Sequence, residues 1–233
     1  MMSAVNFHTF GESSELVLKL SQAICKLLRN TIEKNGKASL VVSGGNTPKK
    51  LFTKLSLCDI AWDKVVISLC DERWVDNGSD DSNEKLVKTY LLKNYAKKAN
   101  FIGMFQQITN LEEAKIIYEK IVKDKISPID VIILGMGNDG HTASLFPNNE
   151  KFTEAFSLKN EDFTLVVRQK GVKFHRLGLT RAAILNAKHI FLHFEGKKKF
   201  DIYNAVKDMD DFDKYPISSI LNQKTKNIEV YYA

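Results

Sequence analysis

Apolar residues recur at steps of three and four between positions 13 and 34, which is the spacing of one face of a helix. Gly36 stands just beyond this stretch, where a glycine often ends a helix. The pattern therefore predicts an amphipathic helix over residues 13–34. Its apolar face would consist of Leu16, Leu20, Ala23, Ile24, Leu27, Leu28 and Ile32.

Three shorter runs, at 38–42, 65–70 and 130–135, are almost continuously apolar and rich in β-branched residues. Such runs are typical of strands buried on both faces, and helical patterns separate them, which indicates a parallel sheet covered by helices. The sequence thus favours an α/β fold. The other predicted elements are helices at 48–55, 82–95, 111–125 and 197–206 and strands at 163–168, 189–194 and 228–232, while a short glycine-containing pattern leaves a strand open at 177–180.

The 233 residues contain neither an internal repeat nor a low-complexity linker. The polar segment 76–81 is predicted to be a loop and not a domain boundary, because a helical pattern follows it at once. A chain of this length can form one α/β domain with a large core. We predict a single domain over residues 1–233.

Composition and charge narrow the classes of partner. Hydrophobic residues make up 44% and charged residues 27%, as in an ordinary soluble enzyme, and the net charge of +6 suits an anionic partner. No basic stripe with interleaved aromatic residues is present, so we expect no nucleic-acid partner. Because no apolar stretch has the length of a membrane span and the N-terminus lacks a secretory pattern, we expect a cytoplasmic protein with no membrane partner.

Cys25, Cys58 and Cys70 form no close pair in the sequence, and their odd number argues against a disulfide framework. We predict three reduced thiols in or near the core, and therefore a reducing compartment. The five histidines likewise lack the spacing of a metal site, so no metal ion is expected.

Three loops follow the carboxyl ends of predicted strands, the edge at which open parallel sheets bind ligands. The first, residues 43–48, reads Ser-Gly-Gly-Asn-Thr-Pro. Its paired glycines let backbone N–H groups approach an anion, and Thr47 and Pro48 suit the N-cap and the first residue of a helix. A phosphate would be favoured at such a helix N-terminus. A tight turn without a ligand explains these residues equally well.

The second and third loops carry side chains suited to catalysis. In the second, residues 70–74, Arg73 offers a planar guanidinium to a phosphate and Asp71 could accept sugar hydroxyls, the alternative being a surface ion pair. In the third, residues 134–147, glycines turn the chain and present His141, which could take a proton from water. N–H groups of this turn could face an oxyanion. A purely structural histidine is the alternative.

Two weaker features are basic. Arg176 follows His175, and three lysines stand at 197–199; each could supply a cation to a phosphate, although solvated surface charge is the ordinary role of such residues. No serine or cysteine nucleophile with a histidine partner is visible.

These segments together resemble the 6-phosphogluconolactonases in identity and order. The matching motifs are Ser-Gly-Gly-Asn-Thr-Pro at 43–48, Asp-Glu-Arg-Trp-Val at 71–75, Asp-Ser-Asn at 81–83 and Leu-Gly-Met-Gly-Asn-Asp-Gly-His-Thr-Ala-Ser-Leu-Phe-Pro at 134–147. The resemblance continues through Arg176, 179–180, 185–187 and 196–199, so it covers nearly the whole chain. It implies a Rossmann-like three-layer α/β/α sandwich with a mostly parallel central sheet, shared with the related glucosamine-6-phosphate deaminases.

Two segments separate the chain from those deaminases. Deaminases usually carry Asp-Glu-Tyr where Asp71-Glu72-Arg73 stands here, and Ile-Ala-Phe-Asn-Glu-Pro where Thr-Ala-Ser-Leu-Phe-Pro occupies 142–147. The chain also departs from the lactonases. Val-Lys-Phe-His at 172–175 stands where prolines are common, Glu195-Gly196 replaces Thr-Gly, and no tryptophan occurs within 228–232.

The resemblance implies hydrolysis of 6-phospho-D-glucono-1,5-lactone to 6-phospho-D-gluconate, in the oxidative pentose phosphate pathway, without a metal or organic cofactor. His141 would be the general base, Asp139 would hold its loop or ring, and Asp71 would orient a sugar hydroxyl. Lys199 matches the lysine of the family's Gly-x-x-Lys motif. The phosphate-binding set would be Gly44, Gly45, Asn46, Thr47, Arg73, Arg176 and Lys199.

The expected partner is a small anionic phosphosugar lactone, bound by a monomer or small homo-oligomer. Two other functions stay open. An amino-sugar-phosphate deaminase or isomerase would release ammonia from glucosamine 6-phosphate, whereas a non-catalytic sugar-phosphate sensor would need the phosphate loop but not His141.

Overall fold

The computed structural model describes residues 5–233 except 106, 109, 169 and 210. Its centre is a parallel sheet of seven described strands in the order β1-β10-β9-β6-β2-β3-β5. The inner strands are buried on both faces because their side chains are mostly apolar, whereas β1 at one edge is largely exposed. The strands are β1 (Val5–Thr9), β2 (Ala38–Val42), β3 (Val65–Leu69), β5 (Asn100–Phe101), β6 (Val131–Leu134), β9 (His189–Phe194) and β10 (Ile228–Tyr232).

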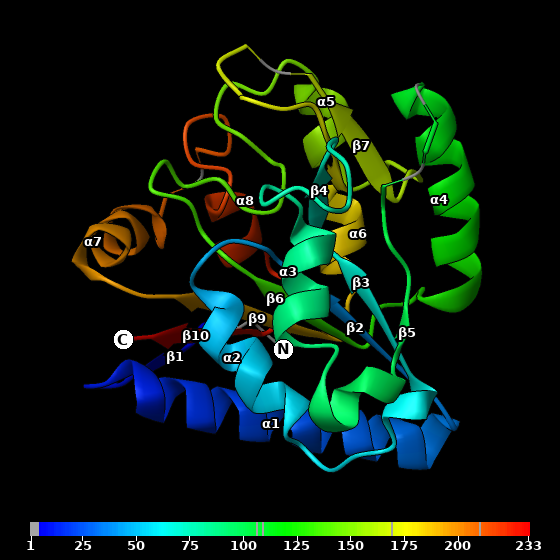
Figure 1. Ribbon diagram of the computed structural model, residues 1–233. Coiled ribbons are helices and arrows are strands. Elements are labelled where there is room, and N and C mark those ends of the chain that lie inside the picture. The colour runs from blue at the N-terminus through cyan, green and yellow to red at the C-terminus, as the bar shows by residue number, and fades with distance from the viewer. Residues whose placement is uncertain (1–4, 106, 109, 169, 210) are drawn as a thin grey trace.

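Helices lie on both sides of this sheet and confirm the expected three-layer α/β/α arrangement. In the view of Figure 1, α1 runs along the underside, where it contacts β2, β6 and β10, while α4, α5 and α6 lie above. No helix among the described residues is long and apolar enough to cross a membrane. The helices are α1 (Ser13–Asn35), α2 (Pro48–Ser56), α3 (Asn83–Tyr90), α4 (Leu111–Lys125), α5 (Phe152–Phe156), α6 (Arg181–Leu185), α7 (Lys197–Val206) and α8 (Ser218–Leu221), with 3₁₀ turns η1 (Trp62–Lys64) and η2 (Asn94–Lys98).

A second, antiparallel sheet stands above the carboxyl edge of the first. It consists of β4 (Asp71–Arg73), β8 (Arg176–Leu179) and β7 (Thr164–Val167), in that order. Its register sets Asp71 opposite Gly178 and Arg73 opposite Arg176. Gly178 has to be a glycine, because a Cβ there would come within 2.6 Å of the Ser144 side chain and 3.3 Å of that of Asp71. The close approach of β4 and β8 brings polar side chains from distant parts of the chain together.

The sequence pattern predicts the long elements well and the short ones poorly. The predicted helix over 82–95 is too long, since α3 ends at Tyr90 and a 3₁₀ turn follows. The pattern does not predict β1, whose side chains are exposed and therefore form no apolar run. It also misses β4 and the helices α5, α6 and α8, each five residues or fewer, because so few residues show no periodicity.

The prediction of three reduced cysteines is wrong for two of them. Cys25 and Cys58 form a disulfide, with Cα atoms 6.6 Å apart, while Cys70 is a buried free thiol. The pairing is invisible in the sequence because 33 residues separate the two cysteines, and only the packing of α1 against α2 brings them together. The cysteine content therefore gives no support for a reducing compartment.

Candidate active site

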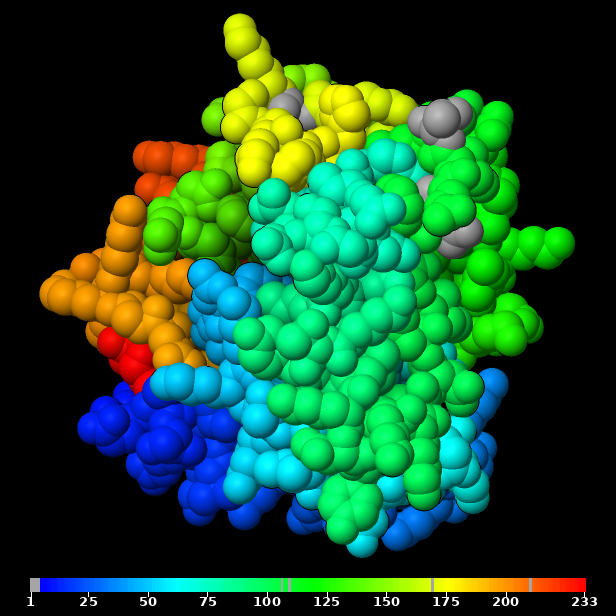
Figure 2. All heavy atoms as spheres, viewed as in Figure 1, coloured from blue at the N-terminus to red at the C-terminus, as the bar shows by residue number. Residues whose placement is uncertain are grey.

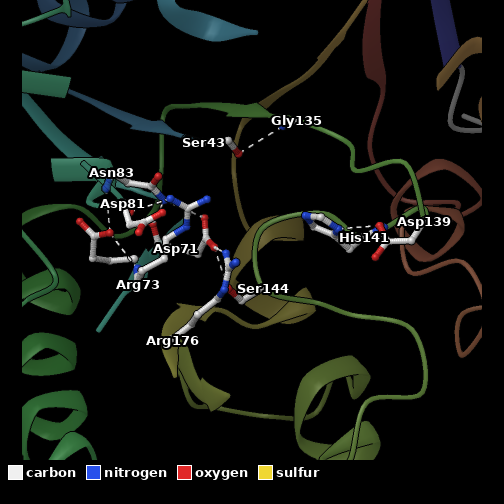
Figure 3. Close-up of polar contacts among 11 residues, drawn as sticks. Ser43, Asp71, Arg73, Asp81, Asn83, Gly135, Asp139, His141, Ser144 and Arg176 are labelled. Carbon is white, nitrogen blue, oxygen red and sulfur yellow. Dashed lines mark hydrogen bonds and ion pairs between the residues drawn. The ribbon is translucent and has the colours of Figure 1, made fainter. Parts of the chain in front are cut away.

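The carboxyl ends of β2 and β6 form the switch point of the central sheet. From β2 the chain continues to β3 and β5 on one side, and from β6 to β9 and β10 on the other. Open α/β sheets bind ligands at such points. The first and third glycine-rich loops leave the sheet here and are joined, since Ser43 N–H donates to the Ile133 carbonyl at 3.0 Å and Gly135 N–H donates to Ser43 Oγ at 3.2 Å (Figure 3).

A cavity of about 190 Å³ opens between these loops. Segments from distant parts of the sequence meet around it. Figure 2 shows α2, the loop after β6 and α7 together on one face, beside α3. Nine of the ten site residues predicted from the sequence line the cavity: Gly44, Gly45, Asn46, Thr47, Asp71, Arg73, His141, Arg176 and Lys199. The tenth, Asp139, lies behind one of them.

Asp139 contacts the histidine. His141 Nδ1 lies 2.6 Å from Asp139 Oδ1, and the backbone N–H of His141 donates to the same oxygen at 3.2 Å (Figure 3). Partial burial acts to raise the pKa of Asp139, but the hydrogen bond and charge of His141 outweigh it and lower the pKa to about 2. The carboxylate is thus ionised near neutral pH and accepts the Nδ1 proton. This leaves Nε2 of His141 as the basic ring nitrogen.

The glycines of the third loop are required by its shape. Gly140 has a φ of 79°, and a Cβ on Gly137 would collide with the His141 ring. The N–H groups of both glycines are already used, because Gly137 donates to the His141 carbonyl at 2.8 Å and Gly140 to the Gly137 carbonyl at 3.2 Å. The expected oxyanion donors therefore do not come from these two glycines.

The first loop keeps the N–H groups of its two glycines open. Those of Gly44 and Gly45 make no hydrogen bond with the described residues, and Gly45 has a φ of 93°. A Cβ on Gly44 would collide with the Asn83 side chain, so only glycine fits. Thr47 occupies the N-cap of α2 and Pro48 the first helical position, as expected, but Thr47 makes no side-chain capping bond. The N-terminus of α2 is thus available to an anion.

Asp71 holds the guanidinium of Arg176. Its Oδ2 accepts from Ser144 Oγ at 2.7 Å and from Arg176 Nη1 at 3.0 Å, and its side chain is nearly buried. Its Oδ1 accepts from Asn83 Nδ2 at 3.4 Å. Both oxygens are therefore engaged by the protein, so in this structure Asp71 positions Arg176. Its predicted contact with a sugar hydroxyl stays a prediction.

Two guanidinium groups stand next to each other at this end of the cavity. Arg73 and Arg176 are register partners in β4 and β8, and like charges directly opposite in a sheet repel. The carboxylate of Asp71 compensates the charge of one of the two, Arg176. Arg73 Nη1 donates only to the Asp81 carbonyl, at 2.6 Å, and the Nε atoms of both arginines are buried without a partner among the described residues. Buried donors of this kind call for an acceptor, and an anion in the cavity would supply it.

Glu72 has a structural role that the sequence does not reveal. It is fully buried, and its carboxylate accepts four hydrogen bonds, from the N–H groups of Arg73 (2.7 Å), Asn83 (2.8 Å) and Glu84 (2.7 Å) and from Ser82 Oγ (3.1 Å). Burial raises its pKa even though these N–H groups oppose the shift. The carboxylate caps the N-terminus of α3 and fixes β4 against it.

Replacing Glu72 with glutamine should therefore loosen this joint. The amide nitrogen cannot accept hydrogen bonds, so some of the four buried donors lose their partner. We therefore expect the free energy of unfolding to fall by about 1–3 kcal/mol. Urea unfolding of Glu72→Gln and of Glu161→Gln, an exposed position, provides the comparison. Equal midpoints for the two variants would contradict the capping role.

Nearly the whole chain matches the model of one protein family. The model of the glucosamine-6-phosphate isomerases/6-phosphogluconolactonase family matches residues 11–230. The chain belongs to this family. Among its relatives are the 6-phosphogluconolactonases of Mesorhizobium japonicum, 35% identical over 99% of this chain and 96% of the relative, and of Pseudomonas aeruginosa, 36% identical over 94% and 92%.

Solved structures of the glucosamine-6-phosphate isomerase/6-phosphogluconolactonase family confirm the fold. A 6-phosphogluconolactonase from Shewanella baltica superimposes with a TM-score of 0.95 at 36% identity, covering 100% of this chain and 99% of that one. A putative 6-phosphogluconolactonase from Neisseria gonorrhoeae superimposes with a TM-score of 0.91 at 33% identity, covering 99% of this chain and 100% of that one. The family resemblance inferred from the motifs is thus confirmed.

Several residues of this family member line or support the cavity without having been predicted from the sequence. Asn83 and His193 line it, and Ser144 and Glu72 hold residues that do. Asn83 and Ser144 lie within motifs that carry the family resemblance, which is a usable signal. His193 lies inside an apolar strand pattern, where nothing distinguishes it from a core residue.

Lys199 is the lysine that reaches the cavity. It lines the cavity from the first turn of α7 and is half-buried, and this burial lowers its pKa. Lys197, by contrast, is exposed and pairs with Asp201 at 2.7 Å. This placement agrees with the choice of Lys199 from the Gly-x-x-Lys spacing.

Proposed function

We propose that this chain is a 6-phosphogluconolactonase, which hydrolyses 6-phospho-D-glucono-1,5-lactone to 6-phospho-D-gluconate. One observation supports the proposal above all. A histidine–carboxylate pair, His141 and Asp139, stands at the same small cavity as two adjacent arginines with unused buried donors. A base and an anion site together suit a phosphorylated substrate with a hydrolysable bond. The relatives named 6-phosphogluconolactonase, which match over nearly their full length, support the same reaction.

In the proposed reaction His141 Nε2 takes a proton from a water molecule as the water oxygen bonds to the lactone carbonyl carbon. Asp139 stabilises the imidazolium that forms, through the Nδ1–H bond. The tetrahedral intermediate then collapses, its ring C–O bond breaks, and His141 returns the proton to the departing ring oxygen. Water is consumed, one carboxylic acid and one hydroxyl result, and no redox step occurs.

The remaining polar residues of the cavity bind the phosphate group of the substrate. Arg73, Arg176 and Lys199 hold the phosphate as cations, and the open N–H groups of the 43–48 loop complete its shell at the N-terminus of α2. The backbone N–H groups and the two arginines, which are held in a loop and a sheet, lose little conformational entropy when the phosphate binds.

The location and assembly of the enzyme are part of the same proposal. A sugar phosphate carries charges that do not cross a bilayer unaided, so the enzyme is placed in the cytoplasm, as a monomer or small homo-oligomer.

The direct test is an assay with freshly generated 6-phosphogluconolactone, coupled to 6-phosphogluconate oxidation and corrected for spontaneous hydrolysis. We expect turnover far above that background. Parallel incubation with glucosamine 6-phosphate should release no ammonia. Ammonia release without lactone hydrolysis would instead identify a deaminase, and binding without either reaction would identify a sensor.

Asp139 provides a second test of this mechanism. With a pKa of about 2, it remains a carboxylate throughout the usual assay range. Asp139→Asn replaces the acceptor with a group that can donate to Nδ1, which favours the wrong tautomer of His141. We expect kcat to fall roughly 10- to 100-fold, less than in a fully buried catalytic triad because the Asp139 side chain is half exposed. Steady-state kinetics of Asp139→Asn beside Asp162→Asn, an exposed position, measures the effect; equal kcat values would contradict this role.

A further inference from the structure

The carboxyl end of β9 carries a second histidine at the cavity. His193 is only 2% exposed and lines the cavity together with Lys199. In the sheet, Leu192 of β9 pairs with Leu134 of β6, so His193 follows at the edge from which the His141 loop also leaves. A buried imidazole in the wall of a substrate cavity is not needed for packing, since an apolar side chain would fill that place at lower cost.

A carboxylate holds the ring of His193. Its Nε2 lies 3.1 Å from Glu195 Oε1. The hydrogen bond with His193 is the largest cause that lowers the pKa of Glu195, with Ser13 and Lys50 acting in the same direction against the effect of burial. Glu195 is therefore ionised and accepts from Nε2–H of His193, which fixes the ring. Nδ1 then donates to an anion in the form of the imidazole that carries both ring protons.

The charges around His193 favour an anion. Two lysines of the described chain, Lys50 from α2 and Lys199 from α7, interact electrostatically with the carboxylate of Glu195. Lys199 is half-buried, and no ion pair within 4 Å holds its ammonium among the described residues. This end of the cavity thus has more positive than negative charge, and burial keeps water from screening it fully.

We propose that His193 is a further substrate-binding residue, which contacts the phosphorylated end of the substrate beside Lys199 while Glu195 positions its ring. The inference rests on the proposed function, because it assigns part of the site to the phosphate of that substrate. In this arrangement a histidine–carboxylate pair at the carboxyl end of β9 recognises the anion, whereas the pair on the loop after β6 performs the chemistry. His193 thereby contributes to the preference for a phosphorylated lactone over an unphosphorylated one.

The experiment compares two substrates, 6-phosphogluconolactone and glucono-1,5-lactone, in His193→Gln. We expect KM for the phosphorylated lactone to rise about tenfold, the effect of one lost hydrogen bond to a charged group, with kcat within about twofold. For the unphosphorylated lactone kcat/KM should stay unchanged, so the preference falls about tenfold. Glu195→Gln and Glu195→Thr should reduce the preference in the same direction by a smaller factor.

The matched control is His189→Gln, an exposed histidine at the other end of β9. It should behave as the wild type with both substrates. An equal loss of kcat/KM on the two lactones in His193→Gln, or an unchanged preference, would overturn the inference. If circular dichroism shows that His193→Gln does not fold, the partly exposed Glu195→Gln decides, and an unchanged preference there overturns it. Failure of the wild type to hydrolyse 6-phosphogluconolactone would remove the proposed function itself, which is a separate result.

Discussion

His141→Ala is expected to lower kcat for 6-phosphogluconolactone by roughly 10²–10⁴-fold, the usual contribution of a general base. The side chain is partly exposed in a glycine-rich loop and contacts Asp139 and the Phe146 ring, so its loss should not unfold the protein. KM should change little, because the anion-binding groups remain in place. Steady-state kinetics with correction for spontaneous hydrolysis, beside far-ultraviolet circular dichroism, measures both effects.

His175→Ala is the control for this experiment. His175 is an exposed histidine next to Arg176 that does not line the cavity, so its removal should leave kcat near the wild-type value. Wild-type turnover in His141→Ala would show that the water is activated by another group. The same loss in both variants would point to an indirect effect on the loops.

Arg73→Ala should act on binding. Among the described residues, the buried Nε of Arg73 has no partner and its side chain makes one hydrogen bond, to the Asp81 carbonyl, so most of its donors are free for a phosphate. A charge-assisted hydrogen bond contributes about 1.5–3 kcal/mol, which corresponds to roughly a 10- to 100-fold increase in KM. Since the phosphate is bound equally in the ground and transition states, kcat should be nearly unchanged.

Substitution of Arg73, in preference to Arg176, separates an effect on binding from an effect on stability. Removal of Arg176 would leave the buried Asp71 carboxylate without its cation, so a loss of stability would be mixed with a loss of binding. Arg168→Ala is the matched control, because Arg168 is a partly exposed arginine of the neighbouring sheet region that pairs with Glu112 away from the cavity. A fall in kcat with constant KM in Arg73→Ala would contradict a binding role.

The sequence predicts those parts of the molecule that rest on periodicity or on a motif. The buried strands β2, β3 and β6 follow from near-continuous apolar runs, and the loops after them follow from glycine placement. What the pattern cannot give is the pairing of β4 with β8, because three residues carry no period and their partner is about a hundred positions away. The adjacency of Arg73 and Arg176, on which the proposed anion site depends, is therefore a product of tertiary structure.

The roles of the buried polar residues are likewise not predictable from the sequence. Asp71, Glu72 and Arg73 form one acidic and basic cluster in the sequence, yet the structure gives them three different tasks: holding Arg176, capping α3 and facing the cavity. Composition cannot separate these tasks, since they depend on which donors surround each carboxylate. His193 shows the converse: it is a polar residue of the cavity wall that lies within an apolar strand pattern.

The strand order of the central sheet also bears on the synthesis of this protein. β6 lies between β2 and β9, so while the ribosome is still making residues 135–188, one edge of β6 has no neighbour and its backbone groups can pair with another chain. The His141 motif is made during that interval. Lys199 and His193, which also line the cavity, are made later, so a nascent or truncated chain that ends before β9 would carry the His141 motif without the part of the cavity that β9 and α7 provide.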